Sequence, residues 1–146
     1  MNNPTIEQIG TFLRAVDSLF PVPLSHKQDL TEFSKKLFEK ATLCTIINED
    51  KIVSMVAGYT EYVTDGLAYI SIVGTLKHWQ GKGYAKTLLQ RFFDICRAKR
   101  LRGIHLYAVK TNVSAVKMYM DLGFTEWKTE QEPRPHDLHL LYLLEE

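Results

Sequence analysis

The spacing of apolar residues predicts two helices at the start of the chain. Apolar side chains in residues 5–20 recur three and four positions apart, which places them on one face of a helix. Pro21 ends this helix and, with Pro23, forces residues 20–25 into an extended segment. The same helical spacing returns further on and predicts a second helix from about residue 27 to residue 40.

Three runs of β-branched and apolar residues follow, and each predicts a β-strand. The runs cover residues 42–47, 51–59 and 67–76. Short polar turns containing Asn, Asp or Gly join them. Consecutive strands joined by short turns imply an antiparallel meander.

The second half of the chain alternates between helical and strand patterns. Helices are predicted over 83–99 and 114–122, with a strand over 103–109 between them. Two last strands are expected over 124–128 and 138–144. The order of elements predicts an α/β (α+β) fold: a mixed, mainly antiparallel twisted sheet flanked by helices, with one strand–helix–strand crossover near its middle.

Composition and charge narrow the functional class. The chain has 146 residues, of which 45% are apolar and 24% charged, and we find no repeat or linker. We therefore expect residues 1–146 to form one globular domain. The 18 basic and 17 acidic residues leave a net charge of +1, so no electrostatic signal for nucleic acid is present.

Neither a membrane nor a metal is expected as a partner. No apolar run approaches the length of a membrane span, and the start of the chain lacks a secretory pattern. Cys44 and Cys96 lie in apolar patterns without metal-type spacing, which is typical of reduced core cysteines in a cytoplasmic protein. His136 and His139 are three residues apart, which in a strand places them on opposite faces.

The most informative stretch is the turn Gln80-Gly81-Lys82-Gly83-Tyr84-Ala85, between a predicted strand and the longest amphipathic helix. Its glycines let the backbone turn tightly and approach a ligand, and the start of the helix leaves N–H groups unpaired. This combination predicts a phosphate or pyrophosphate site, to which Lys82 and Lys86 would add positive charge. A plain strand-to-helix connection is the alternative.

Two familiar phosphate motifs do not fit this turn. A dinucleotide fingerprint that starts at Gly81 would need a sixth residue that is glycine, but Lys86 stands there. A Walker loop that ends at Lys86-Thr87 would need glycines where the chain has Gln80 and Ala85. Both motifs are therefore excluded.

Two motifs together resemble the GNAT superfamily of N-acetyltransferases. Gln80-x-x-Gly83-x-Ala85 matches the acetyl-CoA motif of that family, and Asn112-x-x-Ala115-x-x-x-Tyr119 resembles its second signature. A helix and a strand separate them, as in the family. The resemblance extends from about residue 40 to the C-terminus. It implies acetyl-CoA as co-substrate, no metal, and a small-molecule amine or a protein N-terminus as acceptor.

The resemblance also implies which residues bind acetyl-CoA. Backbone N–H groups of the glycine turn would bind the pyrophosphate, and the strand before it would guide the pantetheine arm. A bulge at Gly74 is expected to open space beside this strand. The implied cofactor-binding residues are Ile72, Val73, Thr75, Gln80, Gly81, Lys82, Gly83, Tyr84, Ala85, Lys86, Asn112 and Ala115.

Tyr119 is the implied catalytic acid. It matches a tyrosine that donates a proton to the departing CoA thiolate in many relatives, and a phenol is a proton donor at neutral pH. A core tyrosine that only packs its helix is the alternative. The implied reaction is direct attack of the amine on the thioester, without an acyl-enzyme, with a strand N–H such as that of Val73 polarising the carbonyl.

Several residues are candidates for the general base. Glu61, at the end of the second strand, is the first candidate, with Asp65 behind it, although many exposed carboxylates only aid solubility. A proton relay through His105 or Tyr107, or a chain of water molecules, is the alternative. Ser71 and Tyr69 share a strand face with Val73 and are expected to line the acceptor cleft.

The N-terminal region departs from the family. Most relatives begin with a short strand, whereas residues 2–4 are too short for one, so that strand is missing or displaced here. The stiff segment 20–25 is expected to form one wall of the acceptor pocket. Two other functions stay open: a non-catalytic acyl-CoA-binding or regulatory module, and a nucleotide-phosphate binder. Homodimerisation through the late strands is also open.

Overall fold

The computed structural model describes residues 3–61, 63–128 and 134–144. The helices, short 3₁₀ turns (η) and strands follow one another as α1 (Ile6–Val16), η1 (Asp17–Leu19), η2 (Leu24–His26), α2 (Leu30–Lys40), β1 (Thr42–Asn48), β2 (Lys51–Tyr59), β3 (Leu67–Thr75), η3 (Lys77–Trp79), α3 (Tyr84–Ala98), β4 (Gly103–Val109), α4 (Val113–Leu122), β5 (Thr125–Glu126) and β6 (Asp137–Leu143). In this part of the chain, the first strand is β1, which follows both N-terminal helices.

The strands form one six-stranded sheet in the order β1-β2-β3-β4-β6-β5. Every neighbouring pair is antiparallel except β3 and β4, which run parallel. The parallel pair arises because α3 carries the chain back across the sheet between these strands. The predicted mixed, mainly antiparallel fold is therefore confirmed.

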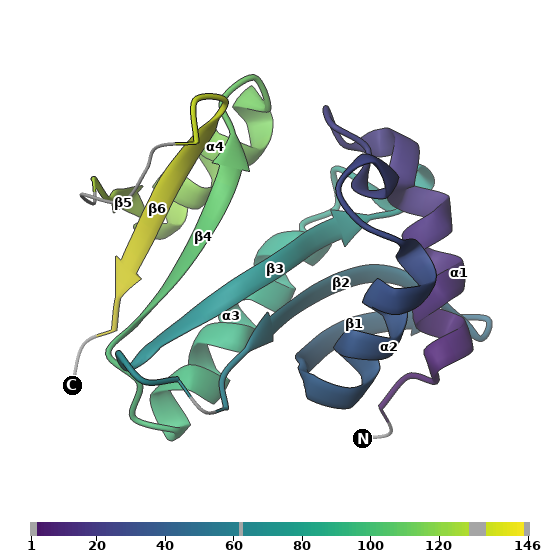
Figure 1. Cartoon of the computed structure of the whole chain (residues 1–146), viewed down its shortest axis with the longest axis horizontal. Helices are drawn as coiled ribbons and strands as arrows, with labels where there is room; N and C mark the ends of the chain where they lie inside the picture. The colour runs from purple at the N-terminus through teal and green to yellow at the C-terminus, as the bar shows by residue number, and fades with distance from the viewer. Residues whose placement is uncertain (1–2, 62, 129–133, 145–146) are drawn as a thin grey trace.

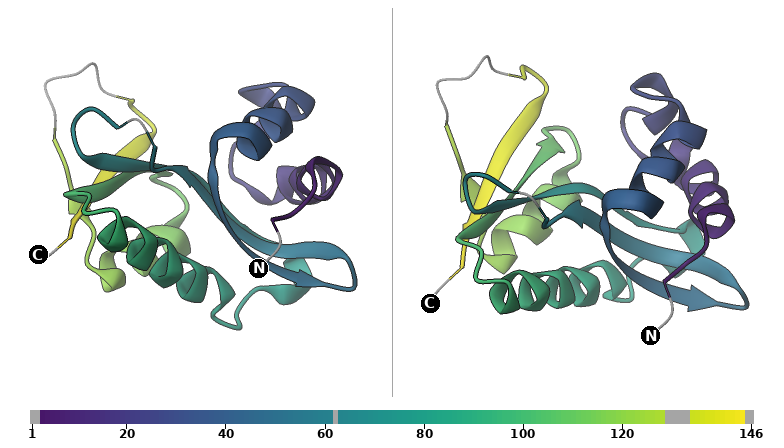
Figure 2. Two further views of the ribbon diagram at one scale, coloured as in Figure 1. Left: turned by 90° about the horizontal axis from the view of Figure 1, so that it is seen from below. Right: turned by 60° about the horizontal axis from the view of Figure 1, so that its bottom comes forward.

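Helices cover both faces of the sheet. Figure 2 shows α1 and α2 on one side and α3 on the other. Two apolar clusters fill the spaces between the layers. Ile9, Leu13 and Leu37 lie in the cluster under α1 and α2, whereas Leu88 and Phe92 of α3 pack into the cluster on the opposite face. Each side chain named here is fully buried, so both clusters contribute hydrophobic stabilisation.

Capping residues explain where the N-terminal helices begin. Thr5 and Gln8 form a capping box at the start of α1. Asp29 accepts hydrogen bonds from the backbone N–H groups of Thr31 and Glu32, so α2 begins at Leu30 and not at the predicted residue 27.

The connection between α1 and α2 is also not fully extended as predicted, because it contains the turn η2. Asp17 holds this turn by accepting hydrogen bonds from the backbone N–H and the hydroxyl of Ser25, at 2.8 and 2.7 Å.

The sheet divides into two halves at β3 and β4. These strands pair only where Leu67–Tyr69 meets Gly103–His105, and beyond that point they separate (Figure 1). The β4–β6 ladder continues to Val109 without β3, so a space opens between the two halves.

The bulge in β3 lies at Ser71 and not at Gly74, which corrects the prediction. On the facing strand Ala57 pairs with Ile72 and Gly58 with Ile70, which leaves Ser71 as the extra residue. The bulge reverses the alternation of β3, because Ile70 lies in the α3-side cluster and Ile72 in the α1-side cluster.

Gly74 has a different role from the one expected, since it pairs with Met55 in the ladder. A Cβ atom at Gly74 would lie 3.3 Å from Phe12 and 3.4 Å from Phe20. The glycine therefore allows the N-terminal region to pack closely on the end of β3.

Candidate functional site

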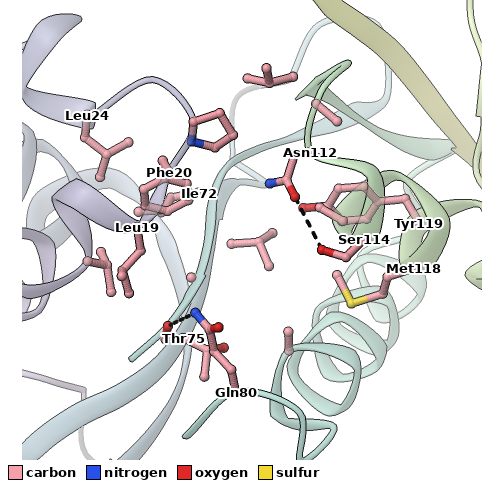
Figure 3. A pocket seen from close by; sticks show the side chains of 18 of the residues that line it. Leu19, Phe20, Leu24, Ile72, Thr75, Gln80, Asn112, Ser114, Met118 and Tyr119 are labelled. Carbon is pink, nitrogen blue, oxygen red and sulfur yellow. Dashed lines mark hydrogen bonds between the residues drawn. The ribbon is translucent and has the colours of Figure 1, made fainter. Parts of the chain in front are cut away.

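A cleft of about 570 Å³ lies where β3 and β4 separate. It reaches from the end of α1 across the sheet to the start of α3 (Figure 3). Three parts of the chain form its walls: the α1–α2 connection, the end of β3 with the glycine turn, and the end of β4 with α4. The lining residues are Val16, Leu19, Phe20, Pro21, Val22, Leu24, Lys27, Ser71, Ile72, Val73, Gly74, Thr75, Trp79, Gln80, Gly81, Gly83, Tyr84, Ala85, Lys86, Tyr107, Ala108, Val109, Asn112, Ser114, Ala115, Met118 and Tyr119.

The glycine turn presents its backbone to open space. Gly81 and Gly83 have φ angles of +79° and +82°, which side chains rarely adopt. A Cβ atom added at either glycine would meet nothing within 4 Å. Gly83 is the N-cap of α3 and offers no side-chain cap, so the first N–H groups of α3 are available to an anionic ligand.

Two contacts hold the residues around this turn. Gln80 Nε2 donates a hydrogen bond to the Thr75 carbonyl at 3.1 Å, which ties the turn to the end of β3 (Figure 3). Lys82 Nζ lies over the Trp79 ring, 5.3 Å from its centroid, and Lys82 does not line the cleft. Every other residue predicted to bind the cofactor lines the cleft, so the fold brings the two sequence motifs together.

The edge of β3 that faces the cleft is suited to bind an extended ligand. Beyond Tyr69, β3 no longer pairs with β4, while its other edge stays paired with β2. Backbone groups on the cleft side therefore have no partner in the β3–β4 ladder. Such an edge can accept an amide-bearing chain as an added strand.

Tyr119 lies in the cleft wall formed by α4. Its side chain is 7% exposed, packs against Phe124 at a ring distance of 5.7 Å, and points toward Asn112 in Figure 3. Burial raises the pKa of the Tyr119 phenol, so the hydroxyl keeps its proton at neutral pH. Ala115 lies on the same face of α4 and also lines the cleft. A protonated phenol at this position can donate a proton or a hydrogen bond.

Glu61 lies outside the cleft. It follows β2, and because β2 and β3 are antiparallel, the end of β2 lies beside the beginning of β3, whereas the cleft lies at the end of β3. The Glu61 carboxylate forms an ion pair with Lys99 at the end of α3. The structure therefore does not bring Glu61 into the cleft, where a general base would have to act.

Asp65 does not line the cleft either. Its carboxylate accepts a hydrogen bond from the Leu67 N–H at 3.0 Å, at the start of β3.

The predicted acceptor wall lies along the cleft together with residues that the sequence did not indicate. Phe20 and Leu24 of the predicted segment line the cleft (Figure 3), and so does Ser71, whereas Tyr69 does not, contrary to the expectation. Leu19, Lys27, Ser114 and Met118 were not predicted to lie there. Met118 follows Ser114 by four residues and Ala115 by three, and this helical spacing is the signal by which both could have been found.

Aromatic and histidine side chains lie together beside the cleft, on the face of β4 and β6 that is turned away from α3. His105 Nδ1 and His139 Nε2 are hydrogen-bonded at 2.9 Å. The rings of Tyr107 and His139 are stacked with centroids 4.3 Å apart. Tyr107 itself lines the cleft, whereas the two histidines do not.

The two cysteines lie in the core, away from the cleft. Cys44 and Cys96 are free and buried, and burial raises the pKa of their thiols to about 11 and about 12. In residues 3–61, 63–128 and 134–144, no group of three or more His, Cys, Asp or Glu side chains is arranged to hold a metal ion. No helix of this part of the chain is long and apolar enough to cross a membrane.

Comparison with known proteins gives one family-level match. The model of the acetyltransferase (GNAT) family matches residues 11–124. The mycothiol acetyltransferase of Nocardiopsis dassonvillei is 34% identical over 70 residues, which are 47% of this chain and 21% of that protein. The chain thus spans about a fifth of the length of this curated relative.

Solved structures share the whole fold. A GNAT-family acetyltransferase from Staphylococcus aureus Mu50 has a TM-score of 0.77 at 17% identity, covering 99% of this chain and 96% of that one. The PaiA N-acetyltransferase from Thermoplasma acidophilum, in complex with coenzyme A, has a TM-score of 0.74 at 13% identity, with coverages of 98% and 97%. At these identities the comparison establishes the fold.

Proposed function

Because the chain belongs to the GNAT acetyltransferase family, we propose that residues 1–146 form one domain that transfers an acetyl group from acetyl-CoA to a primary amine. The acceptor is a small molecule, such as an amino sugar or an amino-acid-like amine, or a protein N-terminus. The main support is the cleft where β3 and β4 separate. It brings together the N-terminus of α3, which has no side-chain cap, the edge of β3 that does not pair with β4, and the buried side chain of Tyr119.

The pyrophosphate and the pantetheine arm of acetyl-CoA each have a matching surface in this cleft. The pyrophosphate fits the glycine turn, where Gly81 and Gly83 leave open space above backbone N–H groups. Lys86 lines the cleft and adds a positive charge next to the start of α3. The amides of the pantetheine arm fit the free edge of β3 at Val73 and Thr75. The cofactor supplies the reactive thioester, and the protein holds it in place.

The residues around the thioester support direct attack by the amine. Held against the β3 edge, the carbonyl would meet a backbone N–H, such as that of Val73, which stabilises the developing negative charge. Tyr119 keeps its proton because burial raises the pKa of its phenol, so it can protonate the leaving sulfur. Positioning of the two reactants contributes much of the acceleration.

The acceptor is proposed to enter between the α1–α2 connection and β4. The wall formed by Leu19, Phe20, Val22 and Leu24 is apolar, and Lys27 adds one positive charge to it. This wall favours an amine that carries an apolar group. The acceptor of the mycothiol acetyltransferase is not transferred to this chain, because the match covers about a fifth of that protein.

Calorimetric titration with acetyl-CoA tests the proposal, with ATP and NAD as control ligands. We expect selective binding of acetyl-CoA, which Gly83→Glu abolishes by placing a carboxylate where the pyrophosphate binds. A thiol-release assay with a panel of primary amines then tests transfer. Binding without thiol release for any amine would instead indicate a non-catalytic acyl-CoA-binding module. Preference for ATP would indicate a nucleotide-phosphate binder.

A further inference from the structure

We infer that His105 and His139 form a proton relay that carries the proton lost by the acceptor amine away from the cleft. The inference rests on the proposed function, because that reaction releases one proton from the amine nitrogen each time an amide forms. It assigns a role to a pair of side chains that β4 and β6 bring together from distant parts of the chain.

The pairing of β4 with β6 determines the geometry of the relay. Tyr107 is directly opposite His139, and His105 is opposite Leu141, in this antiparallel ladder. The two histidines are therefore diagonal neighbours on one face of the sheet. Their hydrogen bond of 2.9 Å joins Nδ1 of His105 to Nε2 of His139. Each ring keeps its second nitrogen for a further partner.

The relay lies where the two halves of the sheet separate. Tyr69 and His105 form the last ladder pair between β3 and β4, and their ring centroids are 5.1 Å apart. Beyond this pair the cleft begins, with Ser71 on one strand and Tyr107 on the other. Tyr107 contacts the cleft and stacks on His139, so a single side chain separates the cleft from the relay.

The hydrogen bond lets the pair accept and release a proton without a net charge. A neutral imidazole has one N–H donor and one acceptor nitrogen. In a neutral pair, one ring therefore has a free acceptor nitrogen and the other a free N–H. A proton taken up at the free nitrogen of His105 shifts the shared proton from His105 Nδ1 to His139 Nε2. His139 then releases its own Nδ1 proton, so one proton enters and one leaves.

The surroundings keep both rings in the neutral form that this transfer requires. Burial lowers the pKa of His105 and of His139, and the His105 ring further lowers the pKa of His139. The charged neighbours act in opposite directions: Asp65 raises the pKa of His105, and Arg134 lowers that of His139. The groups that face the pair from the surrounding elements are Asp65, Tyr69, Tyr107, Trp127 and Arg134, and Arg134 is itself paired with Asp137.

The amine also has to reach the pair. Tyr107 and Ser71 bound the cleft on the side of the α1–α2 connection, where the acceptor is proposed to enter. Glu61, the carboxylate expected for this task, is paired with Lys99 at the other end of β3. We propose that a water molecule passes the proton to His105 first, and that His139 receives it second.

Single substitutions His105→Gln and His139→Gln test the relay, because glutamine keeps a polar side chain but cannot pass a proton on in this way. We expect kcat to fall roughly 100-fold in each, with unchanged affinity for acetyl-CoA in calorimetry. The double variant should be no slower than either single variant, since both residues act as one unit. His136→Gln is the matched control, since His136 is exposed and lies in the same part of the chain.

The pH dependence separates a relay from a purely structural role. In the wild type, log kcat/KM at low pH should rise with a slope of about 2, because both the amine and the histidine pair must lose a proton. In the variants the slope should fall to about 1, since only the amine still titrates. ¹⁵N NMR of the wild type should show both imidazoles neutral at pH 7.

Two results would overturn the relay while leaving the proposed function in place. One is wild-type turnover and an unchanged low-pH slope in both glutamine variants. The other is loss of acetyl-CoA binding in these variants, which would show that the histidines only maintain the cleft. Wild-type protein that binds acetyl-CoA but acetylates no amine overturns the proposed function, and with it the relay.

Discussion

The side chain of Gln80 is hydrogen-bonded to the carbonyl of Thr75, with 3.1 Å between the amide nitrogen and the carbonyl oxygen. This bond joins the glycine turn to the last residue of β3. The turn and the strand edge are the two surfaces that we propose for the pyrophosphate and the pantetheine arm. The bond therefore sets the distance between two parts of one binding site.

Removal of this bond should weaken acetyl-CoA binding without unfolding the protein. A hydrogen bond of this kind contributes about 1 kcal/mol, so Gln80→Ala should lower the affinity roughly 5-fold. Calorimetry measures the affinity, and a thermal melt reports the fold. Gln90→Ala, at an exposed position on α3, is the control and should leave both unchanged. Equal affinities for Gln80→Ala and wild type would contradict a role for the bond.

A methyl group on the glycine turn should affect binding more than stability. Gly81→Ala adds a Cβ that meets no atom within 4 Å, at a φ of +79° that costs about 1 kcal/mol for alanine. We expect at least a 10-fold weaker affinity for acetyl-CoA, because the methyl group lies above the backbone N–H groups. Gly66→Ala is the control, since its φ of +76° imposes a similar backbone strain away from the cleft, where the added Cβ would lie 3.2 Å from the flexible side chain of Arg102. An equal loss of acetyl-CoA affinity in the two variants would show that backbone strain alone weakens binding.

Tyr119→Phe should separate chemistry from binding. The phenyl ring keeps the contact with Phe124 but has no proton to donate, so kcat should fall by roughly 100-fold while KM for acetyl-CoA stays the same. Because burial raises the pKa of Tyr119, its ionisation should produce no loss of activity below about pH 10. Steady-state kinetics measure both effects. Tyr142→Phe, in the same apolar cluster, is the control.

Glu61→Gln should leave turnover unchanged. The carboxylate pairs with Lys99 outside the cleft, and both side chains are partly exposed, so the stability should change by at most about 1 kcal/mol. Thiol-release rates at saturating substrates and a urea titration check the two expectations. A 10-fold or larger loss of kcat would contradict the position that the structure gives to this residue.

The half-buried histidines His105 and His139 should make the free energy of unfolding depend on pH. Burial lowers the pKa of His105 and His139 below the unfolded value near 6.5, so the unfolded chain binds more protons at lower pH. Their neutral forms therefore add stability that is fully present above about pH 6.5 and is lost as the pH falls below it. The urea midpoint should drop between about pH 7.5 and pH 5, and less so in His139→Gln. An equal drop of the urea midpoint in His139→Gln and in the wild type would contradict the assignment of this pH dependence to the histidine pair.

The fold and the cofactor side of the cleft could largely be predicted from the sequence. The strand over residues 51–59 was predicted with the same bounds as β2, because alternation and turn residues are local properties. The glycine turn was found from its glycines and its place before a helix, and the face that contains Asn112, Ala115 and Tyr119 from its resemblance to a family signature. The fold then brings both motifs to one cleft.

The acceptor side depended on the tertiary structure. The end of β2 looked suitable for a base, yet antiparallel pairing places Glu61 beside the start of β3 and away from the cleft. The bulge was expected at Gly74, the more flexible residue, but the ladder register puts it at Ser71. A sequence pattern does not contain the register between strands, because register follows from how both faces pack at once.

The pairing of His105 with His139 also depended on the tertiary structure. The spacing of His136 and His139 within the sequence predicted no joint role for them, and the partner of His139 lies 34 positions away on another strand. Local periodicity and turn chemistry thus determined the elements, the fold class and the family motifs. Only long-range packing decided which strand ends lie at the cleft and which side chains meet across the sheet. The physical reason is that side chains far apart in the chain become neighbours through the pairing of whole strands.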